Sequence, residues 1–299
     1  MGETNVGFVG LGSMGKGMAS SIARSGFPLW VHDLRAEATS ELVERGARPA
    51  ENLSDLSAHC NWIVLSLPDQ SVVEAVLFGD AGLAAVGREG QVIVDCGTTH
   101  PDFSREAAAR LREQGVSFLD APVTGMETRA AAGTLTIMVG GEAAAYEEVQ
   151  PLLDVMGDVV VHMGSPGNGQ LTKMTNNVLY NISCAAMAEM LTLAVKLGLD
   201  ADKVRRVVGS GSGQSFGFDY FSERVLRGEF TQGYPMASAF KDMVAVMERA
   251  NQQQAPLPVA SGAMQTYRMA LAKGLGEEAK GAMIKVWEDL LDVEVRLKE

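Results

Sequence analysis

The sequence has few of the residues that build disulfide frameworks or metal sites. Its 299 residues include only three cysteines and four histidines. Because the cysteines form no Cys-x-x-Cys pair and the histidines show no ligand spacing, we expect a reduced, cytoplasmic protein without a metal site. No apolar stretch reaches the roughly 18 residues that span a bilayer. No basic region precedes the first apolar run, so we expect neither a membrane span nor a signal peptide.

Positive charge is scarce as well. The chain has 25 Lys and Arg against 37 Asp and Glu, a net charge of −12. A nucleic acid or an anionic membrane is therefore not expected as a partner. A small anionic substrate is still possible, because a site can be locally basic inside an acidic protein. The length suggests about two domains.

The first half of the chain alternates strand and helix patterns. Its strands are nearly all apolar, which is typical of a mainly parallel sheet covered on both faces. We predict strands at residues 5–9, 29–32, 62–67, 91–95, 117–120, 134–139 and 159–162, and helices at 16–24, 71–77, 103–114 and 143–153. After residue 164 no strand is predicted, and residues 170–197 read as one long helix. The prediction is a doubly wound Rossmann-type α/β domain over 1–164, joined by this helix to an all-α domain over 165–299.

The strongest motif is a Gly-x-Gly-x-x-Gly turn between the first strand and the first helix. Gly10 permits the tight turn, Gly12 lets the backbone approach a pyrophosphate, and Gly15 lets the helix pack on the strand. The acid Asp33 ends the second strand, where it can bind a ribose hydroxyl and repel a 2′-phosphate. We therefore expect NAD as the preferred cofactor over NADP. The predicted contacts are Gly10, Leu11, Gly12, Ser13, Met14 and Gly15, with Asp33, Leu34 and Arg35 at the ribose.

Three further segments carry a family resemblance. They are Asp120-Ala-Pro-Val-Thr-Gly-Met126 followed by Gly-Thr-Leu at 133–135, Gly167-Asn-Gly-Gln-Leu-Thr-Lys-Met-Thr-Asn-Asn177, and Phe240-Lys-Asp-Met243. With the glycine turn, they resemble the β-hydroxyacid dehydrogenase family, which includes 3-hydroxyisobutyrate dehydrogenase and tartronate semialdehyde reductase. The resemblance covers essentially the whole chain. It implies hydride transfer between NAD(H) and a small 3-hydroxy acid or its semialdehyde.

Lys173 is the predicted catalytic residue. By itself, a lysine on an apolar helix is most often a surface residue whose stem packs on apolar neighbours. Here it lies four residues before Asn177, so both side chains share one helix face. The resemblance makes Lys173 the general acid and base, which would also stabilise negative charge on the substrate oxygen. It makes Asn177 the substrate-orienting neighbour, with Asn176 beside it.

The resemblance also assigns the remaining site residues. Thr124, Gly125 and Met126 form the substrate loop, where Met126 replaces a family glycine and either narrows the loop or points into the core. Without the resemblance, a threonine such as Thr98 would be a strand-end cap and the pair at 241–242 a solvated charge pair. The further cofactor contacts implied by the family are Leu67, Pro68 and Asp69 after the third main strand, Thr98 beside the nicotinamide, and Lys241 on a C-terminal helix.

Alternative functions remain open from the sequence. A 6-phosphogluconate dehydrogenase shares several motifs, but that family is longer and typically has His where Asn176 stands. Enzymes that reduce imines on the same scaffold usually lack the lysine. A non-catalytic dinucleotide-binding scaffold would need neither Lys173 nor Asn177.

The helical half also suggests assembly. It is rich in Met, Ala and Leu, which either fill its own core or form a layer against a second copy. We expect a homodimer or homotetramer whose interface lies mainly after residue 165.

Overall fold

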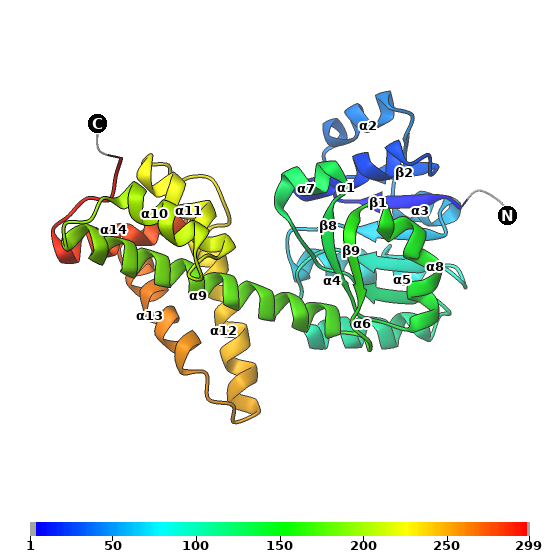
Figure 1. Cartoon of the computed structure of the whole chain (residues 1–299). Coiled ribbons are helices and arrows are strands. Elements are labelled where there is room, and N and C mark those ends of the chain that lie inside the picture. The colour runs from blue at the N-terminus through cyan, green and yellow to red at the C-terminus, as the bar shows by residue number, and fades with distance from the viewer. Residues whose placement is uncertain (1–3, 298–299) are drawn as a thin grey trace. The chain divides into compact units, whose positions relative to one another are not determined.

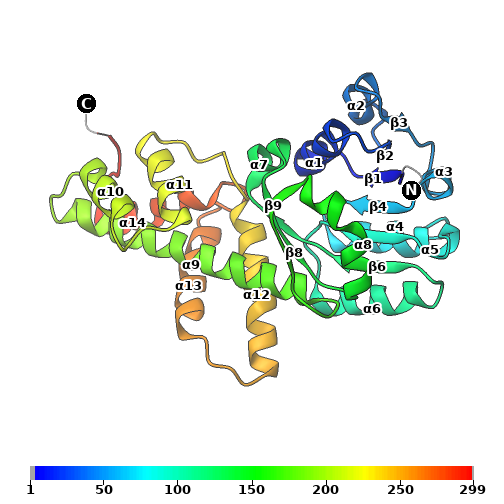
Figure 2. The same ribbon diagram turned by 45° about the vertical axis from the view of Figure 1, so that its right-hand side comes forward.

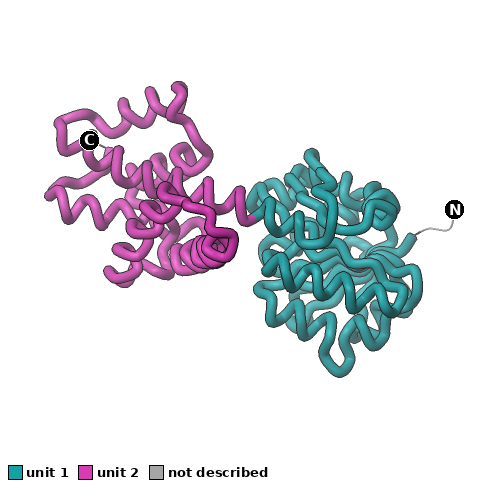
Figure 3. The backbone as a smooth tube through the Cα atoms, turned by 90° about the horizontal axis from the view of Figure 1, so that it is seen from below, with its two compact units in different colours: residues 1–173 teal, residues 174–299 magenta. Residues whose placement is uncertain are grey.

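The chain forms two compact units, residues 1–173 and 174–299, in this computed structural model (Figure 3). The structure describes residues 4–297. The units divide at 173/174, whereas the sequence prediction put the boundary at 164/165. The segment between the two positions groups with the first unit because the start of α9 (Asn168–Lys196) is hydrogen-bonded to the strand ends there.

The first unit is built on a six-stranded sheet (Figure 1), whose strands have the order β3-β2-β1-β4-β5-β6. Every neighbouring pair is parallel. This is the doubly wound strand order, which places a switch point between β1 and β4. The predicted Rossmann-type fold is therefore confirmed. The strands are β1 (Val6–Val9), β2 (Leu29–His32), β3 (Arg48–Pro49), β4 (Trp62–Leu65), β5 (Val92–Asp95) and β6 (Ser117–Asp120).

Helices cover both faces of this sheet (Figure 2). One core packs strand residues such as Phe8 and Val64 against α1 and α8. The other packs alternate strand residues such as Ile63 and Leu65 against α3, α4, α5 and α6. Burial of both faces explains why the strands are almost wholly apolar. The helices are α1 (Ser13–Arg24), η1 (Ala36–Thr39), α2 (Ser40–Glu44), α3 (Leu53–His59), α4 (Gln70–Phe78), α5 (Leu83–Val86), α6 (Pro101–Arg112), α7 (Met126–Ala132) and α8 (Ala143–Asp154).

A second, three-stranded sheet completes the first unit. Its strands are β7 (Val123–Thr124), β8 (Leu135–Val139) and β9 (Gly157–His162), in the order β7-β8-β9. The sequence prediction found β8 and β9 but missed β3 and β7. Each of these has only two residues, too few to show an alternating pattern. The short β7 matters because it leads into the predicted substrate loop.

The second unit is helical around its own apolar core. Among the described residues no strand follows β9, as predicted, although residues 235 and 279 form an isolated bridge. The elements are the greater part of α9, then α10 (Ala201–Ser210), α11 (Phe216–Leu226), α12 (Met236–Gln252), α13 (Pro258–Ala272), η2 (Lys280–Met283) and α14 (Ile284–Leu291).

The long helix α9 differs from the expectation that no apolar stretch is long enough to span a bilayer. Over 18 residues α9 reaches a mean hydropathy of 1.6, enough by length and composition to cross a membrane. The sequence reading missed this because polar residues interrupt the apolar run. About 44% of that window is buried inside the protein, and the core helix of a soluble protein meets the same criterion.

Candidate functional site

The glycine turn is locked by close backbone packing. Gly10 has a φ of 92°, in the region that favours glycine. A side chain there would collide with the carbonyl oxygen of Ser66, and one at Gly15 would collide with that of Gly10. A Cβ on Gly12, in contrast, would meet no atom within 4 Å. The turn therefore has tight packing at Gly10 and Gly15 and an open side at Gly12.

This open side is suited to a pyrophosphate. Gly12 is the N-cap of α1 and supplies no side-chain cap, and the first turn of the helix contains no acid. The first N–H groups of a helix have no partner within the helix and carry partial positive charge. The residues present thus fit a dinucleotide, with the turn beside its phosphates.

Asp33 lies beside the turn. Its carboxylate accepts hydrogen bonds from the backbone N–H groups of Leu11 (2.7 Å) and Arg35 (2.9 Å). Burial raises the pKa of Asp33, but these bonds and the Arg35 guanidinium outweigh burial and lower the pKa overall. The carboxylate is therefore charged and fixed next to the glycine turn. Leu34, at 94% exposure, and the mostly exposed Arg35 face solvent.

Two buried acids end the neighbouring strands β5 and β6. Asp120 accepts hydrogen bonds from Gly167 N (2.7 Å) and Gln170 N (2.9 Å), so it holds the start of α9. Asp95 is aligned with it across the sheet and accepts from Gly97 N at 2.9 Å. Burial raises the pKa of both groups, that of Asp95 to about 7. The carboxyl ends of these strands thus anchor the helix that carries Lys173.

Gln170 strengthens this anchor, and the sequence reading missed it. Its side chain is fully buried, accepts from Thr99 N (3.2 Å) and donates to the Gly97 carbonyl (2.9 Å). It thereby holds the backbone on both sides of Thr98, which is itself exposed. The partners lie more than 70 residues from Gln170 in sequence, so no local pattern could identify them.

Lys173 lies one turn further along α9 and reaches the predicted substrate loop. Its Nζ donates a hydrogen bond of 2.8 Å to the carbonyl oxygen of Val123. Val123 directly precedes the predicted substrate loop, whose residues Thr124, Gly125 and Met126 are half-buried. An ammonium group is therefore held at the loop, rather than lying along the surface as an isolated lysine would.

Met126 adopts a backbone conformation typical of glycine. Its φ is 66°, in the left-handed region where a side chain is strained. The backbone here has a conformation that glycine adopts without strain. Among the described residues, Met126 is absent from the side chains that pack on the core containing α1 and α7. Met126 is half-buried, and both alternatives for its side chain stay predictions.

In the second unit, Asn177 is paired with an acid. Its Nδ2 donates to Asp242 Oδ2 at 3.0 Å, so the acid of the predicted Lys-Asp pair orients the asparagine amide. Asn176 is exposed and donates to Asn177 Oδ1 at 3.4 Å. Lys241 is exposed on α12, and its approach to a cofactor stays a prediction.

The loop after β4 contains the remaining predicted contacts. Leu67 is half-buried, whereas Pro68 and Asp69 are exposed. Asp69 is the N-cap of α4, where its side chain accepts from Val72 N at 3.1 Å. A structural role therefore accounts for Asp69, and its contact with a cofactor stays a prediction.

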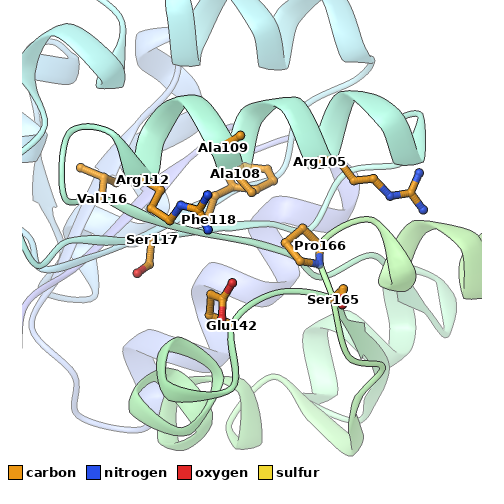
Figure 4. A pocket seen from close by; sticks show the side chains of 10 residues that line it. All are labelled: Arg105, Ala108, Ala109, Arg112, Val116, Ser117, Phe118, Glu142, Ser165 and Pro166. Atoms are coloured by element: carbon orange, nitrogen blue, oxygen red, sulfur yellow. The ribbon is translucent and has the colours of Figure 1, made fainter.

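Two hollows lie on the first unit. One of about 370 Å³ borders the start of α1 and includes Ser13 and Lys16. The other, of about 310 Å³, lies between α6 and the loops at Glu142 and Ser165 (Figure 4). None of the predicted site residues lines the second hollow, so it lies outside the candidate site.

Comparison with known proteins covers nearly the whole chain. Residues 5–164 match the family described as the NAD binding domain of 6-phosphogluconate dehydrogenase. Residues 167–287 match the family described as NAD-binding of NADP-dependent 3-hydroxyisobutyrate dehydrogenase. The chain is 36% identical to the 2-(hydroxymethyl)glutarate dehydrogenase of Eubacterium barkeri, over 97% of each protein.

Solved structures agree with these matches. The 3-hydroxyisobutyrate dehydrogenase of Salmonella typhimurium superimposes with a TM-score of 0.86 at 32% identity, covering 95% of this chain and 99% of that one. A structure of Psf3 in complex with NADP+ and 2-OPP has a TM-score of 0.84 at 27% identity, covering 94% of this chain and 99% of that one.

Proposed function

The chain belongs to the β-hydroxyacid dehydrogenase family, and we propose that Lys173 is the general acid and base of its reaction. Members of this family are NAD(P)-dependent oxidoreductases that act on hydroxy acids or their semialdehydes. A bound NAD(P) supplies or accepts the hydride. For this chain we propose a small 3-hydroxy acid or its semialdehyde as the substrate.

The position of Lys173 is the observation that carries the proposal. Its Nζ lies 2.8 Å from the Val123 carbonyl oxygen, at the entry to the loop of Thr124. An ammonium group there can donate a proton to a substrate carbonyl oxygen, and in the reverse direction the neutral amine of Lys173 can receive the hydroxyl proton. The same charge stabilises an oxygen that becomes negative. The Val123 carbonyl oxygen holds Nζ at the loop, and the bonds of Asp120 hold the helix.

The first experiment screens NAD reduction at alkaline pH with hydroxyisobutyrate, glycerate, serine, threonate, hydroxybutyrate, 2-(hydroxymethyl)glutarate and sulfonated analogues. We expect turnover with at least one of these acids. Lys173→Ala should lower kcat by at least about a thousandfold, because it removes both the proton donor and the charge. NADH should bind the variant with an unchanged Kd in a fluorescence titration.

Lys196→Ala is the matched control, since Lys196 is an exposed lysine at the other end of α9. It should keep wild-type turnover. Full activity of Lys173→Ala would contradict the proposed role. If the wild type oxidises none of the screened acids, these acids are excluded as substrates.

We also propose a preference for NAD over NADP. The support is the charged Asp33 carboxylate beside the glycine turn, which disfavours a 2′-phosphate. Asp33→Asn should narrow the ratio of kcat/KM with NADH to kcat/KM with NADPH by about tenfold or more. A wild-type enzyme that prefers NADPH would contradict the preference.

No specific observation favours the alternative functions. A non-catalytic scaffold would leave the contact between Lys173 and the loop without a purpose. Imine reduction on this scaffold usually lacks that lysine. The acid–base function remains the one that the geometry supports best.

Finally, we propose a cytoplasmic homodimer or homotetramer without membrane or nucleic-acid partners. Exposed apolar side chains form one stripe on α9 and the residue directly after it, at Leu179, Met190, Leu193 and Leu197. Their spacing places them on a single helix face, which a second copy can cover. Light scattering should give a multiple of 31.7 kDa. Leu193→Glu should shift this mass toward the monomer, whereas a monomeric wild type at micromolar concentration would contradict the proposal.

A further inference from the structure

Lys280 is a buried cation in the helical unit, and the proposed reaction does not use it. Only 2% of the residue is exposed. Its Nζ donates to Asn181 Oδ1 at 2.5 Å and lies 3.8 Å from the centroid of the Tyr180 ring. The Tyr234 ring is 5.5 Å away. An amide oxygen and aromatic faces are typical partners for an ammonium group removed from water.

Such burial needs a reason, because desolvating an ammonium group is costly. Replacement of buried charges by apolar side chains of similar volume often leaves a protein as stable or more stable. The apolar core around Lys280 could hold a methionine, as it already does at Met236 and Met243. Stability alone therefore does not explain the charge, whereas the orientation of its partners can.

The partner Asn181 connects two helices. While Oδ1 accepts from Lys280, the Nδ2 group donates to the Ala239 carbonyl of α12 at 3.2 Å. One turn earlier on α9, Asn177 donates to Asp242 of α12 at 3.0 Å. Two amide contacts, one turn apart, thus tie α9 to α12.

Lys280 also comes from a segment that holds the start of α12. Met236 N donates to the Glu278 carbonyl and Ala237 N to the Gly276 carbonyl, both at 3.0 Å. Lys280 lies two residues after Glu278, and its side chain extends to α9. It therefore joins the same two helices that the amide contacts connect.

We infer that Lys280 is a positioning residue for Asn177. Its ammonium group fixes the amide of Asn181, which fixes the register of α12 against α9. That register sets the pair between Asp242 and Asn177, and so the orientation of the Asn177 amide. The inference deepens the proposed function, because it rests on Asn177 orienting the substrate.

The test uses the full-length protein with Lys280→Met, Asn181→Leu and the double variant. We expect each single variant to lower kcat/KM for the hydroxy acid by about ten- to hundredfold through misplacement of Asn177. The Kd for NADH should stay within twofold. The double variant should lose no more activity than either single variant, because both changes break the same connection.

Lys285→Met is the matched control. Lys285 is an ammonium on the next helix that bonds to Glu278 at 2.5 Å and lies 4.3 Å from the Phe230 ring. Within residues 4–297 these two side-chain partners both lie outside α9, so removal of the Lys285 ammonium should leave kcat/KM within twofold. If Lys280→Met fails to fold, the double variant, which buries two apolar groups together, provides the comparison.

A second readout is independent of catalysis. Hydrogen exchange of peptides covering residues 174–184 should accelerate in Lys280→Met and stay unchanged in Lys285→Met. Exchange of the Lys280→Met variant at the wild-type rate would overturn the inference. This readout needs no turnover, so a failure of the proposed function, seen as no oxidation of any acid, can be distinguished from a failure of the inference. Full activity of Lys280→Met, or losses that multiply in the double variant, also overturn it.

Discussion

The candidate site residues of the two units are held by different kinds of hydrogen bond. In the first unit, the acids at strand ends bond to backbone N–H groups, as Asp33 does with Leu11 and Asp120 with Gly167. In the second unit, the contacts of α9 include pairs of side chains, Asn177 with Asp242 and Lys280 with Asn181, beside the bond from Asn181 to the Ala239 carbonyl. The cause is the backbone itself. Strand ends and helix starts have N–H groups to offer, whereas those inside a helix are bonded to carbonyl groups one turn earlier.

The difference separates two kinds of specificity. A site formed by backbone N–H groups recognises the pyrophosphate that all dinucleotides share, and it tolerates substitution of side chains. A site built from paired side chains in a helical unit can be altered by single substitutions. We therefore expect cofactor binding to depend on the first arrangement and fine orientation of the substrate on the second.

The largest expected effect comes from a backbone-held acid. Asp120→Ala leaves the N–H groups of Gly167 and Gln170 without their acceptor, which should cost about 2–5 kcal/mol. By thermal denaturation this is a decrease in Tm of roughly 5–15 °C. Turnover should also fall, because the start of α9 supports Lys173. Asp154→Ala, at an exposed acid of α8, should leave Tm unchanged. Equal Tm values for the two variants would contradict the anchoring role.

A smaller, pH-dependent effect is expected at Asp95. Burial raises its pKa from 3.8 to about 7, so between these values the folded protein binds a proton that the unfolded chain has lost. Stability therefore falls as pH rises from about 4 to 7, and the penalty is complete above pH 7. Asp95→Asn removes this dependence. The difference in Tm between Asp95→Asn and the wild type should increase by several degrees in favour of the variant from pH 4.5 to pH 8. A difference in Tm that stays constant over this range would show that Asp95 does not titrate there.

The smallest effect tests a side-chain pair of the second unit. The buried Thr266 hydroxyl donates to Glu189 at 2.9 Å, and Glu189 itself is exposed. Thr266→Val keeps the volume and leaves Glu189 hydrated, so the loss should be about 1 kcal/mol. Thermal denaturation at pH 7 measures it. A loss as large as that of Asp120→Ala would remove the contrast between the units.

The sequence predicted the first unit in detail. Five of its six sheet strands were predicted within one or two residues, because two-sided burial makes them apolar runs. The glycine turn could be predicted because its glycines are required by nearby backbone. A side chain at Gly15 would meet the carbonyl of Gly10, and one at Gly10 would meet the carbonyl of Ser66, after the adjacent strand β4. The two-residue strands β3 and β7 were missed, since they have no period.

The helical unit was predicted only as a class. Its residues show helix periodicity, but which helices pair depends on contacts such as those of Lys280 with Asn181, 99 positions apart. No local pattern marks such a partner.

The sequence by itself determined the Rossmann-type sheet, and it predicted the dinucleotide turn and Lys173 as a catalytic candidate, because each depends on neighbours in the chain or on a family motif. Only the tertiary structure decided that Asp120 and Gln170 hold the start of α9, that Lys173 reaches Val123, and that Asp242 orients Asn177. These partners lie about 50 to 70 residues apart, and only folding of the backbone brings their polar groups within hydrogen-bond distance.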